Sequence, residues 1–255
     1  FHATIPDHAR TYALPASLRE DLGIRKYGFH GTSHQYVSEE AAKFLGVPFE
    51  TFRGVSCHLG SGGASLCAVV NGKSVDNTMG YSPLQGLIMS TRCGDLDPAV
   101  PLELLVRAEG NWNAVEDRMN KRSGVLGMSG LSADVRDVFA ALARGRDTPQ
   151  LNRTAQAYVW RIRRYLGAYL TVVRPAHAVI FTDTIGETCP EVRWKVCADM
   201  AWFGLKMNHE INASAAELPA DVADAESPVR ILAIRTNEEL AIARRVHETL
   251  KDGVA

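Results

Sequence analysis

Short apolar runs alternate along this chain with longer segments in which apolar residues recur every three or four positions. The short runs are rich in Val, Leu, Ile and Cys, and they predict β-strands at residues 55–60, 64–70, 177–182 and 229–234. Asn71-Gly72 follows the second run and is the strongest short signal for a hairpin turn, so residues 73–76 are expected to form the returning strand. The first three strands are therefore predicted to form a meander.

The longer segments have the spacing of amphipathic helices. Their starts are predicted near Thr32, Asp97-Pro98, Ser132, Leu151, Pro190 and Thr236. Thr32 with Gln35 and Thr236 with Glu239 fit capping boxes, and Ser132 fits an N-cap. The helix that starts near Leu151 is expected to run to about Val173. Strands that alternate with helices in this way predict an α/β fold.

Two polar stretches are expected to lie on the surface. Residues 214–228 are small and acidic, which predicts a surface loop. Arg161, Arg163 and Arg164 form a basic run on the long helix, and such a run is usually a solvated face.

Composition excludes several classes of function. The 255 residues carry a formal net charge of −1, which gives no electrostatic reason to expect nucleic acid or an anionic membrane as a partner. No long stretch is uniformly apolar, so no transmembrane helix is expected. The five cysteines are scattered without a C-x-x-C pair, which favours a reduced, cytoplasmic protein over a zinc or disulfide protein. The chain opens without a methionine or a leader, and we expect that a segment before Phe1 is missing.

The stretch VSCHLGSGGAS places a histidine and several glycines between two predicted strands. Gly60, Gly62 and Gly63 surround Ser61 in the turn, and His58 lies near the end of the preceding strand. One or two glycines would supply the positive φ that a hairpin turn needs. A run of exposed backbone amides in such a turn can instead bind an anion such as a phosphate. The residues alone leave both interpretations open.

Other candidates also have a structural alternative. The turn TDTIGET joins a strand to a helix, a position where α/β sheets bind ligands, although most such turns are only connections. Arg92 could bind phosphate or carboxylate oxygens, or it could form a salt bridge with Asp95 or Asp97. His30 could be catalytic or could pack in the interior. Glu238 could meet a magnesium-bound phosphate or could stabilise the dipole of the last helix.

Five segments taken together resemble the acetate kinases of the acetokinase family, in order and in spacing. They are RKYGFHGTSHQYV, VSCHLGSGGASLCAVVNGKSVDNTMGYSPLQGL, MSTRCGDLDP, KRSGVLGMSGLSADVRD and RTNEELAIA. The similarity runs from Phe1 to about His247. It implies an actin-like, sugar-kinase type of fold (ribonuclease H-like), with a mixed sheet and flanking helices. It also implies the transfer of a phosphoryl group between ATP and acetate, with Mg²⁺, to give acetyl phosphate and ADP.

The resemblance also implies a domain organisation. Residues 1–236 correspond to the second, nucleotide-binding domain of the family, and residues 237–255 to a C-terminal helix that packs on the first domain. We expect that this first domain, which would carry the catalytic aspartate, is absent from this chain. The isolated chain is therefore expected to be inactive. The family is homodimeric through the second domain, so a homodimer is expected.

Roles are carried over residue by residue. His30 is similar to the histidine that stabilises the transition state, and Arg92 to the arginine that binds the transferred phosphoryl group. Glu238 is similar to the glutamate associated with magnesium. Nucleotide-binding roles are implied for His58, Gly60, Ser61, Gly62, Gly63, Asp134, Val135, Arg136, Thr184, Ile185, Gly186 and Thr188.

The chain departs from the family pattern at nucleotide contacts. The family has asparagine at the position of Ser61, and its second loop reads G-G-I-G-E-N where this chain has residues 183–188. A positive φ at Thr184 would be strained, because threonine is β-branched. These changes indicate an altered affinity for ATP or a preference for another phosphoryl donor. Propionate or butyrate as the acceptor, and a nucleotide-binding or dimerisation module without activity of its own, stay open as alternatives.

Overall fold

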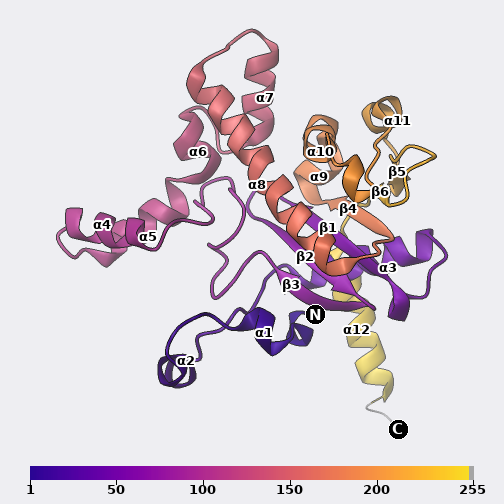
Figure 1. The fold of residues 1–255 in the computed structure, drawn as a ribbon, viewed down its shortest axis with the longest axis horizontal. Coiled ribbons are helices and arrows are strands. Elements are labelled where there is room, and N and C mark those ends of the chain that lie inside the picture. The colour runs from indigo at the N-terminus through magenta and orange to yellow at the C-terminus, as the bar shows by residue number, and fades with distance from the viewer. Residues whose placement is uncertain (253–255) are drawn as a thin grey trace.

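A computed structural model describes residues 1–252 and has a six-stranded mixed sheet at its centre (Figure 1). The strands are β1 (Arg53–Leu59), β2 (Ala64–Val70), β3 (Lys73–Asn77), β4 (Ala178–Thr182), β5 (Ala220–Asp221) and β6 (Arg230–Ala233). Their order across the sheet is β3-β2-β1-β4-β6-β5. The pairs β1–β4 and β4–β6 are parallel and the other pairs are antiparallel. The predicted meander is confirmed, whereas the predicted loop at 214–228 contains the edge strand β5.

Helices surround this sheet. The α-helices are α1 (Asp7–Arg10), α2 (Ala16–Leu22), α3 (Gly31–Phe44), α4 (Ala99–Arg107), α5 (Trp112–Lys121), α6 (Gly124–Ser129), α7 (Val135–Ala143), α8 (Pro149–Val173), α9 (Asp183–Thr188), α10 (Pro190–Cys197), α11 (His209–Ser214) and α12 (Glu238–Asp252). Three 3₁₀ turns are η1 (His2–Thr4), η2 (Phe49–Thr51) and η3 (Ala201–Phe203). None of the helices within residues 1–252 combines the length and apolar character that a membrane crossing requires.

The sheet separates two hydrophobic cores. On one face α8 crosses the sheet and contacts β1 and β2, and the core there continues under α9 and α10 (Figure 1). On the other face α3 contacts β1 and β4 over a smaller core that contains Val37, Phe52 and Ile180. α12 packs along α3 and extends away from the sheet toward the C-terminus (Figure 1).

Alternation along β1 places polar side chains in the second layer. Val55, Cys57 and Leu59 belong to the core under α8. Because successive side chains of a strand point to opposite faces, Ser56 and His58 face α3 instead. Both are buried, at 0% and 4% exposure. A buried polar group needs a hydrogen-bond partner, so the α3 face is the place to look for a built site.

Two helix starts differ from the prediction. Thr236 is not the cap of α12, because the side chain of Asn237 accepts a hydrogen bond from the Leu240 amide at 3.0 Å. The long helix begins at Pro149, two residues before the predicted start near Leu151, and the Thr148 side chain accepts a hydrogen bond from the Leu151 amide. In both cases the polar side chain next to the helix satisfies a free amide that the helix itself leaves unpaired.

The basic run of α8 is not simply a solvated face, so that prediction is wrong. Arg161 donates to the Gly86 carbonyl oxygen at 2.8 Å and lies 3.8 Å from the Asp95 carboxylate. Arg164 donates to the same carboxylate at 3.0 Å. These contacts fasten the irregular segment between β3 and α4 to the long helix. They also decide the environment of Arg92, which lies in that segment.

Candidate active site

Most of the residues predicted to carry chemistry lie at one edge of the sheet. The parallel strands β1, β4 and β6 all end there. The chain then continues into the glycine turn 60–63, into α9 and into the segment that leads to α12. The carboxyl ends of parallel strands are where open α/β sheets bind ligands. The fold therefore brings together segments that are about 50 to 170 residues apart in the sequence.

The glycines of the turn are required by close packing and not by backbone conformation. None of Gly60, Gly62 and Gly63 has a positive φ. A Cβ at Gly60 would lie 2.5 Å from Asp183 Oδ2, and a Cβ at Gly63 would lie 3.3 Å from both Arg92 Nη1 and His30 Nε2. A hairpin that needs glycine only for positive φ does not account for these contacts.

The turn also presents free backbone donors. The Gly60 amide donates to the Gly63 carbonyl oxygen at 3.0 Å. Within residues 1–252, no protein acceptor is hydrogen-bonded to the amides of Ser61 and Gly62. Ser90 Oγ donates to the Ser61 carbonyl oxygen, which fixes the orientation of that peptide unit. Adjacent free amides in a turn form an anion-binding concavity.

Arg92 lies beside this turn without a carboxylate partner. The predicted alternative of a salt bridge to Asp95 or Asp97 is wrong. Asp95 accepts from Arg164 at 3.0 Å and from Tyr165 at 2.7 Å, and Asp97 accepts from the Ala99 amide at 2.8 Å. Among the residues that the structure describes, no acidic group lies within 4.0 Å of the Arg92 guanidinium. The guanidinium is therefore available to an anionic ligand.

His30 presents one ring nitrogen to the turn. Its Nδ1 is 2.8 Å from Ser65 Oγ, and its ring stacks on the His58 ring with centroids 4.1 Å apart. Its Nε2 is directed toward Gly63 and Arg92. Burial, assisted by the neighbouring His58, lowers the pKa of His30 to about 3, so the imidazole is neutral near pH 7. His30 also serves as the N-cap residue of α3 with φ +61°, so the predicted cap at Thr32 is wrong.

His58 lies between α3 and α9, with a partner on each ring nitrogen. Nδ1 is 2.9 Å from Ser33 Oγ, and Nε2 is 2.8 Å from Asp183 Oδ2. The hydrogen bond to His58 holds the pKa of the Asp183 carboxyl well below its usual range. Asp183 has φ +62°, whereas Thr184 lies outside the left-handed region. The expected strain at Thr184 is therefore wrong, because an aspartate, which tolerates this backbone better, adopts it.

Glu187 was not anticipated as part of the site, and it ties two of the segments together. Its Oε1 accepts hydrogen bonds from the Asp183 amide at 2.9 Å and from the Thr236 amide at 3.0 Å. Thr236 Oγ1 also lies 2.9 Å from Ser33 Oγ. The start of α12 is thus fixed to α9 and to α3 by side-chain contacts. A glutamate one residue after the glycine of the turn was the only sequence signal for this role.

Residues 134–136, 184–186 and 188, for which nucleotide-binding roles are implied, form a second group. Asp134 caps α7 by accepting from the Arg136 amide at 2.9 Å, so the predicted cap at Ser132 is wrong. Asp134 also forms an ion pair with Arg136 at 2.5 Å. Arg136 Nη1 donates to Thr188 Oγ1 at 3.2 Å, which joins α7 to α9.

The remaining residues of this group lie on α7 and α9. Val135, Ile185 and Gly186 are buried, and Thr188 Oγ1 donates to the Thr184 carbonyl oxygen at 2.6 Å. Residues 183–188 form a helix rather than the glycine turn that the sequence suggested. The structure therefore brings residues 134–136 and 184–188 together. Asp183, at the start of α9, connects this group to the glycine turn 60–63.

Glu238, which the resemblance associates with magnesium, is exposed in the first turn of α12. Within residues 1–252 there is no group of three or more His, Cys, Asp or Glu side chains arranged to hold a metal ion. Mg²⁺ in phosphoryl transfer usually takes one or two carboxylates together with phosphate oxygens and water. A single exposed carboxylate next to the site fits that pattern, because the nucleotide would supply the other oxygens.

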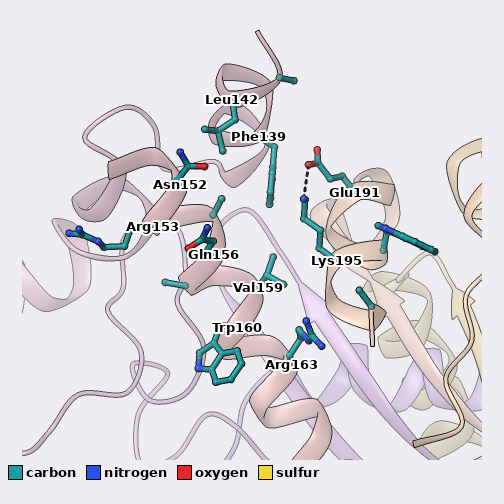
Figure 2. A pocket seen from close by; sticks show the side chains of 15 residues that line it. Phe139, Leu142, Asn152, Arg153, Gln156, Val159, Trp160, Arg163, Glu191 and Lys195 are labelled. Carbon is teal, nitrogen blue, oxygen red and sulfur yellow. Dashed lines mark ion pairs between the residues drawn. The ribbon is translucent and has the colours of Figure 1, made fainter. Parts of the chain in front are cut away.

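A large groove lies away from these residues. A groove of about 970 Å³ lies between α7, α8 and α10, and Figure 2 shows Phe139, Trp160 and the Glu191–Lys195 ion pair along it. It contains none of the predicted catalytic or nucleotide-binding residues. The candidate active site thus lies outside this groove.

Comparison with known proteins agrees with the resemblance. Residues 1–244 match the model of the acetokinase family. The chain is 46% identical over 252 residues to acetate kinase from Acetivibrio thermocellus and 44% identical over 252 residues to acetate kinase from Heliobacterium modesticaldum. These alignments cover 99% and 98% of this chain, and 62% of each relative.

Solved structures are also similar. The crystal structure of Porphyromonas gingivalis acetate kinase superposes with a TM-score of 0.93 at 36% identity, over 98% of this chain and 62% of that one. A propionate kinase from Francisella tularensis gives 0.87 at 35% identity, over 95% and 60%. The predicted actin-like fold is thereby confirmed, and the chain spans about 62% of the length of the curated relatives that it matches. The chain belongs to the acetokinase family.

Proposed function

We propose that this chain is the nucleotide-binding part of a phosphotransferase that transfers the γ-phosphoryl group of ATP to the carboxylate of acetate. The reaction is reversible and yields acetyl phosphate and ADP. One observation carries the proposal: an unpaired guanidinium, Arg92, and a free imidazole nitrogen of His30 flank a glycine turn with two free amides. The relatives that are named acetate kinase support the choice of reaction.

In this proposal each group acts on developing charge. An acetate oxygen attacks the γ-phosphorus, the bond to the β–γ bridging oxygen breaks, and ADP leaves with that electron pair. Phosphoryl transfer requires positioning and charge stabilisation more than covalent catalysis. Arg92 neutralises charge on the transferred group, and neutral His30 donates a hydrogen bond from Nε2. The Ser61 and Gly62 amides hold the phosphate oxygens, and Glu238 would hold Mg²⁺, which neutralises phosphate charge when bound.

The nucleoside would lie along the second group of residues. The hydrogen bond between Arg136 and Thr188 joins α7 to α9 beside the glycine turn. The adenosine of a bound nucleotide would therefore extend from its phosphates along this edge of the sheet. Residues 1–236 would then be the nucleotide-binding domain. The isolated chain would be inactive, because the rest of the catalytic groups would come from the other domain.

α12 supports the existence of that other domain. Its Leu240, Ile242, Val246 and Leu250 side chains are 36% to 62% exposed, which leaves an apolar stripe without a partner among residues 1–252. We infer that the helix at 237–255 packs on the first domain of the complete protein. Residues 253–255 of that range lie outside the described residues.

Propionate is a second candidate acceptor, since a propionate kinase superposes with a TM-score of 0.87. One methylene group changes discrimination by about 1–3 kcal/mol, so the two acids can be separated only by comparing kcat/KM. Part of the pocket for the acceptor acid would come from the other domain. The preference between acetate and propionate would therefore depend on residues outside this chain.

A homodimer is also proposed, with a second copy covering the groove of Figure 2. Trp160 on α8 is 66% exposed in that groove, and Trp194 on α10, which is 36% exposed, is among the residues that line it. Light scattering should give twice the monomer mass, and Trp160→Glu should shift it toward monomer. Trp202, 95% exposed and outside the groove, provides the control Trp202→Glu. A monomer at all concentrations would contradict the proposal.

Two measurements test the function. Calorimetry should show binding of one ADP per chain in the presence of Mg²⁺, and Arg136→Ala should weaken it. In the complete protein, a hydroxamate trap should detect acetyl phosphate, and Arg92→Ala should lower turnover about 10²-fold or more, as expected for a lost charge-stabilising donor. An Arg92→Ala enzyme with full turnover would remove the role assigned to Arg92.

A further inference from the structure

One carboxylate lies among the groups that would receive phosphate. Asp183 Oδ2 is 2.8 Å from His58 Nε2, and it lies so close to the turn that a Cβ at Gly60 would be 2.5 Å away. The side chain is 27% exposed, so it lies at the surface of the site and not in the core. Within residues 1–252, the Ser61 and Gly62 amides of the turn have no protein acceptor, and Arg92, at its other side, has no acidic group within 4.0 Å. Asp183 is therefore an anion within a set of groups suited to anions.

The carboxylate is held firmly in this position. Its Oδ1 accepts from the Thr184 amide at 2.5 Å and from Thr184 Oγ1 at 2.9 Å. The Asp183 amide donates to Glu187, and the backbone adopts φ +62°, which a non-glycine residue rarely adopts without support. These contacts orient the side chain toward His58. The Asp183 contacts are not those of an N-cap residue. The N-cap residue of α9 is Thr182, and its side chain makes no capping hydrogen bond.

We propose that Asp183 is a specificity-determining residue that occupies, on His58 Nε2, the place of a phosphate oxygen of the phosphoryl donor. This inference rests on the proposed function. His58 has both ring nitrogens engaged within the protein, through Ser33 and Asp183, so it binds a phosphate only if Asp183 moves away. The donor therefore competes with an internal carboxylate for the same nitrogen.

The Asp183 carboxylate should lower the affinity of the chain for polyphosphate, relative to the same chain without a charge at residue 183. A carboxylate and a phosphate in adjacent positions repel each other, and the repulsion is strong where the surroundings are partly desolvated. Removing the charge at residue 183 should therefore tighten binding. The gain should be similar for inorganic pyrophosphate and for ADP, because both place phosphate oxygens at the turn and the nucleoside contacts of ADP are the same with and without the charge.

Asp183→Asn tests the charge without changing the shape. Asparagine tolerates the left-handed backbone and keeps an oxygen acceptor for His58. Asp183→Gly removes the side chain and suits the same backbone. Asp199 gives a matched control, because it is also an aspartate with a positive φ, at +59°, and its side chain is 91% exposed beside Arg163. Asp199→Asn should therefore change neither affinity.

Calorimetry with ADP and with pyrophosphate, each with Mg²⁺, is the experiment. Both Asp183 variants should bind about tenfold more tightly than the unaltered chain. Equal or weaker binding by both, with the unaltered chain binding ADP, would overturn this inference and leave the proposed function standing. No binding of ADP or pyrophosphate by any of the proteins would overturn both.

A second measurement does not depend on a variant that folds. In the unaltered chain with ¹⁵N-labelled histidine, the His58 Nε2 resonance should shift when pyrophosphate binds, because its acceptor changes from carboxylate to phosphate. Saturation with pyrophosphate without a change at that nitrogen would show that Asp183 keeps its place, and would overturn the inference.

Discussion

Lowering the pH from 7 to 5 should destabilise the fold, because His2, His30 and His34 are buried in their neutral form. Burial is the largest cause of the shift in each: it lowers the pKa of His2 to about 4 and of His30 to about 3, and it places the pKa of His34 well below its ordinary value. In the unfolded chain each histidine titrates near its ordinary pKa of about 6.5. Between about pH 6.5 and 4 the unfolded state therefore binds more protons than the folded state, and stability falls as pH falls.

The size of the effect follows from proton linkage. At pH 5, each histidine that stays neutral in the folded state and titrates near 6.5 in the unfolded state costs about 2 kcal/mol relative to pH 7. Three such residues give a loss of about 6 kcal/mol in the free energy of unfolding, comparable with the whole stability of many domains. The depressed pKa of Asp183 adds a loss of the same sign only as the pH falls below about 4, outside this window.

Urea unfolding followed by circular dichroism at pH 7, 6 and 5 measures this loss. His34 lies fully buried between Ser56 Oγ at 2.9 Å and Ser65 Oγ at 2.7 Å. His34→Gln can keep a hydrogen bond to these hydroxyls and cannot titrate, so it should reduce the pH dependence by about a third. His8 is exposed, and His8→Gln should leave the dependence unchanged. A free energy of unfolding that is the same at pH 7 and pH 5 would refute the reasoning.

Two further predictions concern the edge of the sheet. Gly60→Ala should cost about 1–3 kcal/mol and weaken ADP binding, because its Cβ would lie 2.5 Å from Asp183 Oδ2 and 2.7 Å from the Gly63 carbonyl oxygen. Gly62→Ala is the control, since no atom lies within 4 Å of its Cβ, and equal unfolding midpoints for the two variants would contradict the packing argument. Glu187→Ala should lower stability by about 2–4 kcal/mol and raise hydrogen exchange at the Asp183 and Thr236 amides, because both lose their acceptor. Glu191→Ala, which breaks only a partly exposed 3.6 Å ion pair to Lys195, should do neither, and slow exchange at both amides in Glu187→Ala would refute the role of Glu187.

The elements of the fold could be predicted from the sequence because their signals are local. The run at 64–70 followed by Asn71-Gly72 specifies β2 and its turn, and the structure has β2 and β3 on either side of it. Helix starts were less predictable, because several polar residues compete for each cap. Asn237 rather than Thr236, and Asp134 rather than Ser132, accept the first amides, and the choice depends on backbone direction at the helix entry.

The candidate site was predictable residue by residue but not in its connections. Arg92 could be named from its loop, yet its freedom depends on Arg161 and Arg164 of α8, which take Asp95 from about 70 residues away. That pairing cannot be read from a single sequence. The glycines of the turn could likewise be named from the sequence. The need for glycine at position 60, however, comes from the nearby carboxylate of Asp183, which approaches Gly60 only because β1 and β4 lie side by side.

The buried histidines correspond to a periodic pattern of polar residues in the sequence, which can be recognised once the structure is known. Ser56 and His58 are two residues apart on an otherwise apolar strand, and Ser65 pairs with His58 across the sheet. His30, Ser33 and His34 have the spacing of one helix face. Polar residues at matching positions on a strand and on the helix that covers it indicate a hydrogen-bonded layer rather than a core.

The same layer relates stability to the proposed chemistry. An apolar contact between α3 and β1 would be more stable in acid, because it would contain no group that gains a proton on unfolding. Instead the histidines and serines form hydrogen bonds that fix each ring, and Ser65 Oγ is shared between His30 Nδ1 at 2.8 Å and His34 Nε2 at 2.7 Å. Fixing Nδ1 of His30 leaves Nε2 directed at Gly63 and Arg92. A donor held in place before the ligand arrives needs no reorganisation at the moment of reaction, and preorganised donors of that kind contribute most to stabilising developing charge.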